Sequence, residues 1–182
     1  VILGTRARKT RTKSFNAFSS IDYPETAMFR DRRLIQFLQR PAEYTHAVFS
    51  TALDPNVFVL RLVPGMRADI IPLLEGRYRA LVLESFGVGG LPGGDDGAMF
   101  AAVRDWCGAG HLAVFTTQVP HEGSDLAVYE VGRAAKALPG VLEAHDMTPE
   151  ATAVKLMWVL GQTTDRAEAE KLFLTPVQWD IL

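Results

Sequence analysis

The sequence predicts an α/β domain, a small three-layer fold of the Rossmann-like kind with a mostly parallel sheet of about four strands, over residues 56–182. Two observations predict this class. Short apolar, β-branched runs alternate with segments whose apolar residues recur at helical spacing, which is the pattern of βαβ units. The runs are also apolar at successive positions, which is typical of parallel strands covered by helices on both faces.

The predicted elements follow one another in regular alternation. The expected strands cover residues 57–63, 80–83, 112–115 and 141–142. The expected helices cover residues 95–107, 125–138, 149–160 and 165–174, and a shorter helical segment covers 70–74. Thr148 is a predicted N-cap, because Pro149 and Glu150 follow it in the first helical turn.

Residues 1–45 have a different, loop-rich character. Residues 1–3 look like the end of a strand closed by Gly4, and residues 5–13 are basic without helical or strand periodicity. The apolar residues in 34–38 predict at most a short helix. The chain opens on three aliphatic residues without a methionine, so we interpret residue 1 as a cut within a longer protein.

Composition and charge exclude several function classes. A net charge of −2 and a pI of about 6.1 give no overall field that selects nucleic acid or an anionic membrane. No apolar run approaches the roughly 20 residues that span a bilayer. The single cysteine, Cys107, permits no internal disulfide and favours a reducing compartment. The four histidines are scattered without the spacing of zinc ligands, so we expect no metal site.

A glycine-rich loop over 85–94 is the most conspicuous motif. Ligands of parallel sheets bind beyond the carboxyl ends of the strands, where this loop and those at 64–66 and 117–124 are expected to meet. The loop follows a strand and precedes a helix, as a phosphate cradle would. Its spacing matches neither the dinucleotide nor the P-loop fingerprint, which argues against nucleotide binding. We interpret the glycines as positions that need positive φ angles and close backbone approach.

Two other segments permit several interpretations from the residues alone. The basic stretch 6–13 is typical of a solvated loop, but it could contact nucleic acid or place one lysine against a carboxylate for proton transfer. Thr117 and Gln118 close a strand, where they could meet a ligand or act structurally.

Several short motifs, taken in order, resemble the C-terminal portion of type I, cytoplasmic bacterial L-asparaginases. They are Gly-Thr-Arg-Ala-Arg-Lys at 4–9, Phe-Asn-Ala-Phe-Ser-Ser at 15–20, Ser-Phe-Gly-Val-Gly-Gly-Leu-Pro at 85–92, Thr-Gln at 117–118, Gly-Ser at 123–124, Tyr-Glu-Val-Gly at 129–132 and Asp-Met-Thr-Pro-Glu-Ala-Thr at 146–152. The resemblance implies that 1–22 ends an N-terminal catalytic domain, 23–55 is a linker and 56–182 is the C-terminal α/β domain.

The resemblance also implies a reaction. In this family a threonine nucleophile hydrolyses L-asparagine to L-aspartate and ammonia without a cofactor, helped by a second Thr-Asp-Lys triad. Lys9 resembles the catalytic lysine of that triad by position, whereas neither threonine motif occurs in this chain. A lysine beside such groups can relay a proton and help activate a weak hydroxyl nucleophile. We therefore expect the isolated chain to be inactive.

Partners follow from the same resemblance. Family subunits form homodimers or tetramers in the cytoplasm, and loops of the C-terminal domain approach the neighbour's active site. The corresponding candidates for binding or subunit contact are Arg6, Ser85, Gly87, Gly89, Thr117, Gln118, Tyr129 and Glu130. No nucleic-acid or membrane partner is expected.

Some family members also bind asparagine at an effector site built from these loops. Here Glu84 stands in place of an arginine, Gly90 of an asparagine, Val119 of a cysteine and Arg8 of a threonine. Exchanging a carboxylate-binding arginine for glutamate reverses the interaction, so we expect no asparagine-driven cooperativity.

Two other functions stay open. An asparaginase-like subunit of a Glu-tRNA(Gln) amidotransferase would use the same fold to supply ammonia. A ligand-binding or dimerisation module without catalysis is the third alternative.

Overall fold

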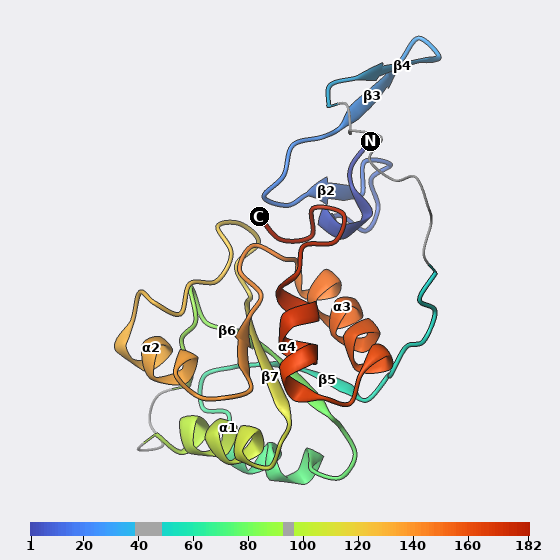
Figure 1. Cartoon of the computed structure of the whole chain (residues 1–182). Coiled ribbons are helices and arrows are strands. Elements are labelled where there is room, and N and C mark those ends of the chain that lie inside the picture. The colour runs from blue at the N-terminus through green and yellow to red at the C-terminus, as the bar shows by residue number, and fades with distance from the viewer. Residues whose placement is uncertain (39–48, 93–96) are drawn as a thin grey trace.

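A four-stranded parallel sheet forms the centre of the molecule (Figure 1). The computed structural model describes residues 1–38, 49–92 and 97–182. The strands are β5 (Val57–Arg61), β6 (Ala80–Ser85), β7 (Leu112–Thr117) and β8 (Val141–Glu143), and they neighbour one another in chain order. All three pairings are parallel, which confirms the predicted α/β class.

Helices cover both faces of this sheet. Successive right-handed crossovers that advance in one direction put their helices on one face. The 3₁₀ turns η2 (Ala68–Ile70) and η3 (Pro72–Leu74), with α1 (Ala98–Gly108) and α2 (Glu130–Lys136), occupy that face, and α3 (Pro149–Gln162) and α4 (Arg166–Leu174) cover the other. The three layers are visible in Figure 1.

Alternating side chains of the strands supply two separate cores. Val82 and Val114 pack towards α3 and α4. Leu83 and Phe115, which neighbour them in the chain, pack towards α1. Because both faces are buried, these strands read as continuous apolar runs in the sequence.

Hydrogen bonds between side chains and backbone amides determine where two of the helices begin. Thr148 caps α3 as predicted, because its hydroxyl oxygen accepts a hydrogen bond from the Ala151 amide at 3.1 Å. The helix expected over 125–138 is shorter, since it begins only at Glu130. The Leu126 amide donates instead to the Glu143 carboxylate at 2.7 Å, which holds the preceding residues in a turn.

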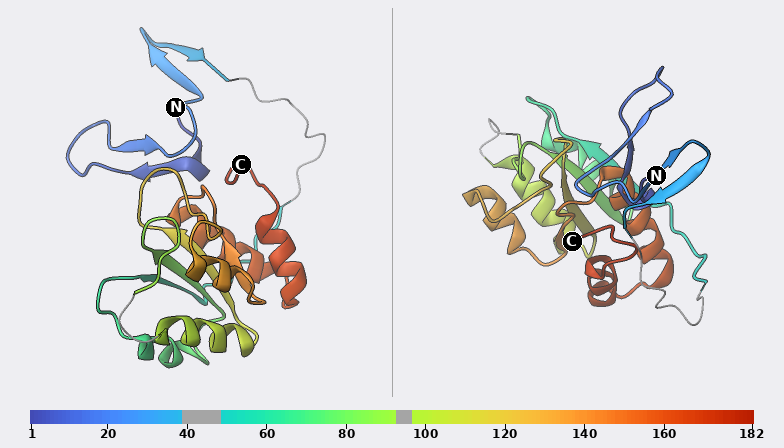
Figure 2. Two further views of the ribbon diagram at one scale, coloured as in Figure 1. Left: turned by 90° about the vertical axis from the view of Figure 1, so that its left-hand side faces the viewer. Right: turned by 90° about the horizontal axis from the view of Figure 1, so that it is seen from above.

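Two antiparallel ribbons precede the domain. The lysine ribbon pairs β1 (Ala7–Lys9) with β2 (Phe18–Ser20), and the outer ribbon pairs β3 (Ala27–Arg30) with β4 (Arg33–Gln36). Figure 2 shows both at the end of the domain where the chain enters α3, with the outer ribbon projecting farthest from it.

Two predictions for this region were wrong. Residues 34–36 form strand β4 rather than helix, because Asp31 and Arg32 adopt positive φ angles and fold the chain back on β3. Residues 1–3 form no strand in the structure. They lead directly into the 3₁₀ turn η1 (Gly4–Arg6), and the Val1 carbonyl accepts a hydrogen bond from the Thr26 amide at 2.9 Å.

No helix among residues 1–38, 49–92 and 97–182 is both long and apolar enough to cross a bilayer.

Candidate functional site

The carboxyl ends of the parallel strands are joined by polar side chains. Gln118 donates through Nε2 to the carbonyl oxygens of Leu62 at 2.6 Å and Glu84 at 2.8 Å. It therefore joins the end of β6 to the segments that leave β5 and β7. This amide lies at the strand ends as expected, and its hydrogen bonds fix the three segments relative to one another.

Ser85 and Thr117 strengthen the same edge. The fully buried Ser85 hydroxyl donates to the Thr116 carbonyl at 2.7 Å. The Thr117 hydroxyl donates to the Gly87 carbonyl and accepts a hydrogen bond from the Val119 amide at 3.0 Å. Both hydroxyls are thus committed to backbone groups.

The glycine-rich loop makes a tight turn at this edge. Gly87 and Gly89 have φ angles of 50° and 148°, which side chains of L-residues rarely adopt. A Cβ atom on Gly89 would lie 2.5 Å from a methyl group of Leu126. The loop therefore needs positive φ angles and close approach, as the sequence predicted.

Tyr129 and Glu130 lie apart from this cluster. They begin α2, and both are exposed. Within the described part of the chain, neither side chain makes a hydrogen bond or an ion pair. They are available to a partner outside this chain.

Lys9 lies on the exposed side of the lysine ribbon, opposite Phe18. Among the described residues, no hydrogen bond or ion pair engages its ammonium group. The neighbouring Arg8 turns to the domain, where its Nε atom lies 3.4 Å from the Glu150 carboxylate. The structure therefore presents Lys9 at the surface beyond the carboxyl edge of the sheet.

Arg6 points in the opposite direction, into the molecule. Its side chain is fully buried. Nη1 lies 2.8 Å from the Asp146 carboxylate and donates to the Asp146 carbonyl at 3.0 Å, and Nε donates to the Trp179 carbonyl at 2.6 Å. Nη2 is buried without a hydrogen-bond partner among the described residues.

Asp146 and Trp179 bring further elements to the same place. The Asp146 carboxylate accepts a hydrogen bond from the Leu182 amide at 3.1 Å. Tyr23 lies beneath the Arg6 guanidinium, 5.6 Å from ring centroid to Cζ, and its ring is 6.2 Å from that of Trp179. Sequence reasoning missed this cluster, because its members lie up to 173 residues apart in the chain.

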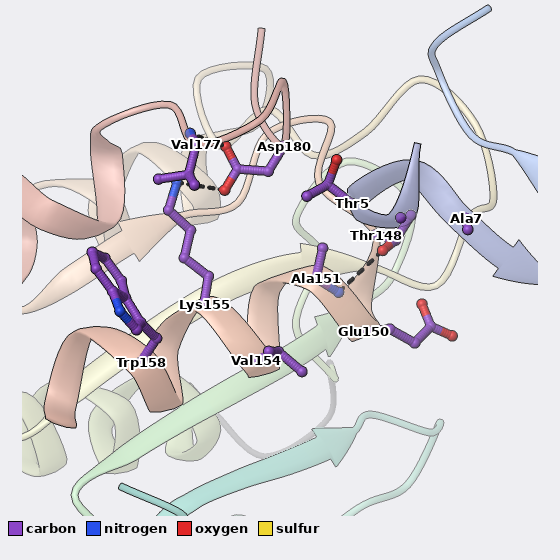
Figure 3. A pocket seen from close by; sticks show the side chains of 11 residues that line it. Thr5, Ala7, Thr148, Glu150, Ala151, Val154, Lys155, Trp158, Val177 and Asp180 are labelled. Atoms are coloured by element: carbon purple, nitrogen blue, oxygen red, sulfur yellow. Dashed lines mark hydrogen bonds and ion pairs between the residues drawn. The ribbon is translucent and has the colours of Figure 1, made fainter. Parts of the chain in front are cut away.

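A cavity of about 370 Å³ separates the start of the lysine ribbon from α3 (Figure 3). Thr5 and Ala7 line one side of it, and apolar residues of α3, including Val154, line the other. Lys155 and Asp180 form a buried ion pair at 2.8 Å at its edge. These two charges are therefore paired with each other, and the other carboxylate that lines the cavity, Glu150, lies 3.4 Å from Arg8.

Comparison with known proteins identifies the fold. The family model for the Glutaminase/Asparaginase C-terminal domain matches residues 56–173. The chain belongs to this family. The resemblance to L-asparaginases noted from the motifs is thereby confirmed.

Two curated relatives extend the similarity beyond the domain. An L-asparaginase of Thermococcus kodakarensis is 39% identical over 173 residues, covering 94% of this chain and 52% of the relative. A Glutamyl-tRNA(Gln) amidotransferase subunit of Metallosphaera sedula is 33% identical over 178 residues, covering 94% and 39%. The chain thus spans about half or less of the length of these relatives.

Solved structures agree with this assignment. The thermostable L-asparaginase from Thermococcus kodakarensis superposes with a TM-score of 0.92 at 35% identity, covering the whole of this chain and 54% of that one. L-asparaginase I from Vibrio cholerae superposes with a TM-score of 0.81 over 98% of this chain and 54% of that one. At 22% identity, the second match shows the fold alone.

The loops that hold Arg8, Thr117 and Val119 leave little space between them. A cavity of only about 10 Å³, lined in part by Arg8, Thr117 and Val119, remains between these loops. A space of this size accommodates about one water molecule. The Glu84 carboxylate is already paired with Arg61 at 3.3 Å.

Metal and thiol chemistry find little support in the described residues. No cluster of three or more metal-ligating side chains occurs among them. Cys107, near the end of α1, is buried in the core, and burial raises the pKa of its thiol to about 11. Such a thiol stays protonated at neutral pH, as expected of a small core residue.

Proposed function

We propose that this chain is the C-terminal part of an L-asparaginase that hydrolyses L-asparagine to L-aspartate and ammonia. The observation that carries the proposal is the extent of similarity. The 39% identity to an L-asparaginase covers 94% of the chain, so it includes much of the ribbon region outside the matched domain family. A domain shared only for its fold would not require similarity there.

In the proposed reaction, a threonine hydroxyl from a preceding domain attacks the side-chain amide carbon of asparagine. The carbon–nitrogen bond breaks, the amide nitrogen takes up the proton of the threonine hydroxyl and leaves as ammonia, and an ester to the threonine remains. Water then hydrolyses this ester, releasing L-aspartate and restoring the hydroxyl. Lys9 relays the proton between the attacking hydroxyl and its neighbours, and no metal or organic cofactor takes part.

The environment of Lys9 supports this role. Its exposed ammonium group has no partner among the described residues, so it can pair with groups that another domain supplies. Neighbouring basic residues are engaged differently, since Arg6 is buried and Arg8 approaches Glu150. Of these three side chains, only that of Lys9 makes no hydrogen bond or ion pair with the described residues.

Lys9→Met in the full-length protein tests the proposal. Ammonia release from asparagine should fall by at least about 10²-fold, because proton transfer by a positioned group contributes on that scale. Lys13→Met, a change at another exposed lysine of the same loop, is the matched control and should leave turnover unchanged. Full activity of the Lys9 variant would overturn the proposal, as would turnover by residues 1–182 alone.

Ammonia supply within an amidotransferase is the second candidate function. Relatives that are subunits of Glutamyl-tRNA(Gln) amidotransferases reach 33% identity over 94% of the chain. The asparaginase match is higher in identity and covers a larger share of its relative. Glutamine hydrolysis that depends on tRNA and spares free asparagine would favour the second candidate. A full-length protein without either activity would favour a non-catalytic module.

The proposed partners are L-asparagine and a second copy of the full-length protein, as a homodimer or tetramer in the cytoplasm. Exposed Tyr129 and Glu130, together with Gly87 and Gly89 of the glycine-rich loop, are the proposed subunit contacts or binding groups. No nucleic-acid or membrane partner is proposed. One solved neighbour is a probable cytoplasmic L-asparaginase from Campylobacter jejuni, and the location is proposed by analogy with it.

We expect the full-length enzyme to show hyperbolic dependence of rate on asparagine concentration. The cavity near Arg8 and Val119 is too small for an amino acid, and Glu84 offers no positive charge to its carboxylate where an arginine would. Initial rates across a hundredfold range of asparagine should give a Hill coefficient near 1. A sigmoidal curve would show that an effector site persists elsewhere.

A further inference from the structure

We propose that Arg6 is a positioning residue for Lys9. In this view Arg6 fixes the base of the lysine ribbon to the α/β domain, so the domain determines where the Lys9 ammonium group lies. The inference rests on the proposed function of Lys9. It assigns to Arg6 an internal role in place of a contact with substrate or with another subunit.

The lysine ribbon holds its own position poorly. Each of its strands has three residues, and isolated two-stranded ribbons are at best marginally stable in water. Phe15 and Phe18, its two aromatic residues, are both exposed and so contribute little burial. Contacts at the base of the ribbon must therefore orient it.

Arg6 lies at that base and touches both strands. It directly precedes β1, and its carbonyl accepts a hydrogen bond from the Ile21 amide at 2.9 Å, just beyond β2. Its side chain continues in the other direction, to Asp146 and Trp179. One residue thus joins the two ends of the ribbon to the turn before α3 and to the C-terminal segment.

The distance from Arg6 to Lys9 makes this base mechanically important. Three extended residues separate their Cα atoms by about 10 Å. A tilt of about 6° at the base would move Lys9 by about 1 Å over this length. Misplacement of a reacting group by about 1 Å can lower a rate by about 10²-fold.

An arginine suits this position better than a lysine does. Two different nitrogens, Nη1 and Nε, reach Asp146 and Trp179 at 2.8 Å and 2.6 Å. A lysine would keep the positive charge for Asp146 but offers a single nitrogen, which cannot reproduce the planar fork. Arg6→Lys therefore preserves charge while removing part of the anchor.

Arg79 provides a matched control within the same chain. It also joins a carboxylate, Asp54 at 2.8 Å, to two backbone carbonyls, those of Leu160 at 3.0 Å and Thr163 at 3.4 Å. It does so outside the lysine ribbon, just before β6. Arg79 matches Arg6 in its partners, but its side chain is 35% exposed whereas that of Arg6 is fully buried. If Arg6 only stabilises the fold, the loss of kcat in Arg6→Lys should be no larger than its loss of folded protein explains, as in Arg79→Lys.

The test measures kcat, KM and amide hydrogen exchange in the full-length enzyme. For Arg6→Lys we expect a 10- to 100-fold loss of kcat with KM changed less than about threefold, and faster exchange over residues 7–20. For Arg79→Lys we expect kcat within twofold of wild type and unchanged exchange there. If Arg6→Lys does not fold, Asp146→Asn, which removes the partner charge, serves in its place and should show the same loss of kcat and the same faster exchange.

The outcomes separate this inference from the proposed function. A loss of turnover in Lys9→Met but not in Arg6→Lys or Asp146→Asn overturns the positioning role alone. Equal losses in Arg6→Lys and Arg79→Lys also overturn it, since general destabilisation would then suffice. If Lys9→Met retains full activity, the proposed function fails first.

Discussion

The α/β domain and the two ribbons are both built from short strands, yet they bury their side chains very differently. In the domain, Leu83 and Phe115 are completely buried. In the outer ribbon, the paired residues Phe29 and Leu34 are 70% and 54% exposed. The sheet has helices on both faces, whereas nothing among the described residues covers this ribbon pair.

This difference in burial implies that the stability of the fold and the position of Lys9 depend on different contacts. Burial of apolar side chains is the main stabilising contribution to a fold, so the domain supplies most of the stability. The lysine ribbon is instead held mainly by polar contacts, those of the fully buried Arg6 and the more exposed contact of Arg8 with Glu150. A proton-transfer group carried on such a ribbon would depend on its anchor more than on the core.

The largest expected effect tests the first half of this comparison. Phe115→Ala should reduce the free energy of unfolding by about 3–5 kcal/mol, because it leaves a cavity between the sheet and α1. Phe29→Ala, the same substitution at an exposed ribbon position, should change it by less than about 0.5 kcal/mol. Urea unfolding followed by circular dichroism measures both. A comparable loss at Phe29 would show that the outer ribbon is covered in solution.

The same contrast explains how far the sequence could predict the fold. Strands β6 and β7 are apolar at successive positions because helices cover both of their faces, and this pattern is visible without a structure. Both extend past the predicted runs, to Ser85 and Thr117. The hydroxyl groups of these two residues donate hydrogen bonds to backbone carbonyls, which cannot be predicted from a hydropathy pattern.

The ribbons were harder to predict for a physical reason. A hairpin exposed on both faces has no alternation of buried and exposed side chains, so Leu34 and Phe37 read equally well as helical spacing. Pairing with β3 decided the outcome. The turn at Asp31 and Arg32 lacks the glycine that usually marks such a connection.

The candidate site likewise contains one feature that the sequence predicts and one that it does not. The glycine loop is a local feature, and its need for positive φ angles at Gly87 and Gly89 follows from the residues themselves. The contacts of Arg6 are not local, since Asp146 lies 140 residues further along the chain. No periodicity in the sequence connects these two residues. The role of Lys9 rests on resemblance and stays a prediction.

A smaller effect is expected where the domain meets the lysine ribbon. Thr148→Ala should lower the free energy of unfolding by about 1 kcal/mol, because the amide of Ala151 loses its cap. Thr148→Ser keeps the accepting oxygen and should cost less than half as much. Thermal unfolding monitored by circular dichroism compares the variants. Equal losses in both would assign the effect to the methyl group rather than to the cap.

The smallest expected effect concerns the attachment of Asp54, just before β5, to the domain, and it depends on pH. Burial tends to raise the pKa of Asp54, but hydrogen bonds from Arg79 and the Asn56 amide, with the Arg79 charge, hold this pKa below its usual value. The contact therefore stabilises the fold fully above the unfolded pKa of about 4, and the stabilisation is lost as pH falls through the lower folded pKa.

Asp54→Asn tests this, since it removes the charge but keeps an oxygen for the Asn56 amide. The variant should be less stable than wild type by up to about 1 kcal/mol at pH 7, the range of a partly exposed ion pair. This difference should shrink as pH falls below the unfolded pKa of about 4, because the wild-type carboxylate takes up its proton as pH approaches its lower folded pKa. Urea unfolding at each pH provides the measurement, and a difference that stays constant down to pH 3 would contradict it. The segment around Asp54 would then be held by packing, as the domain is, rather than by a charged contact like that of Arg6.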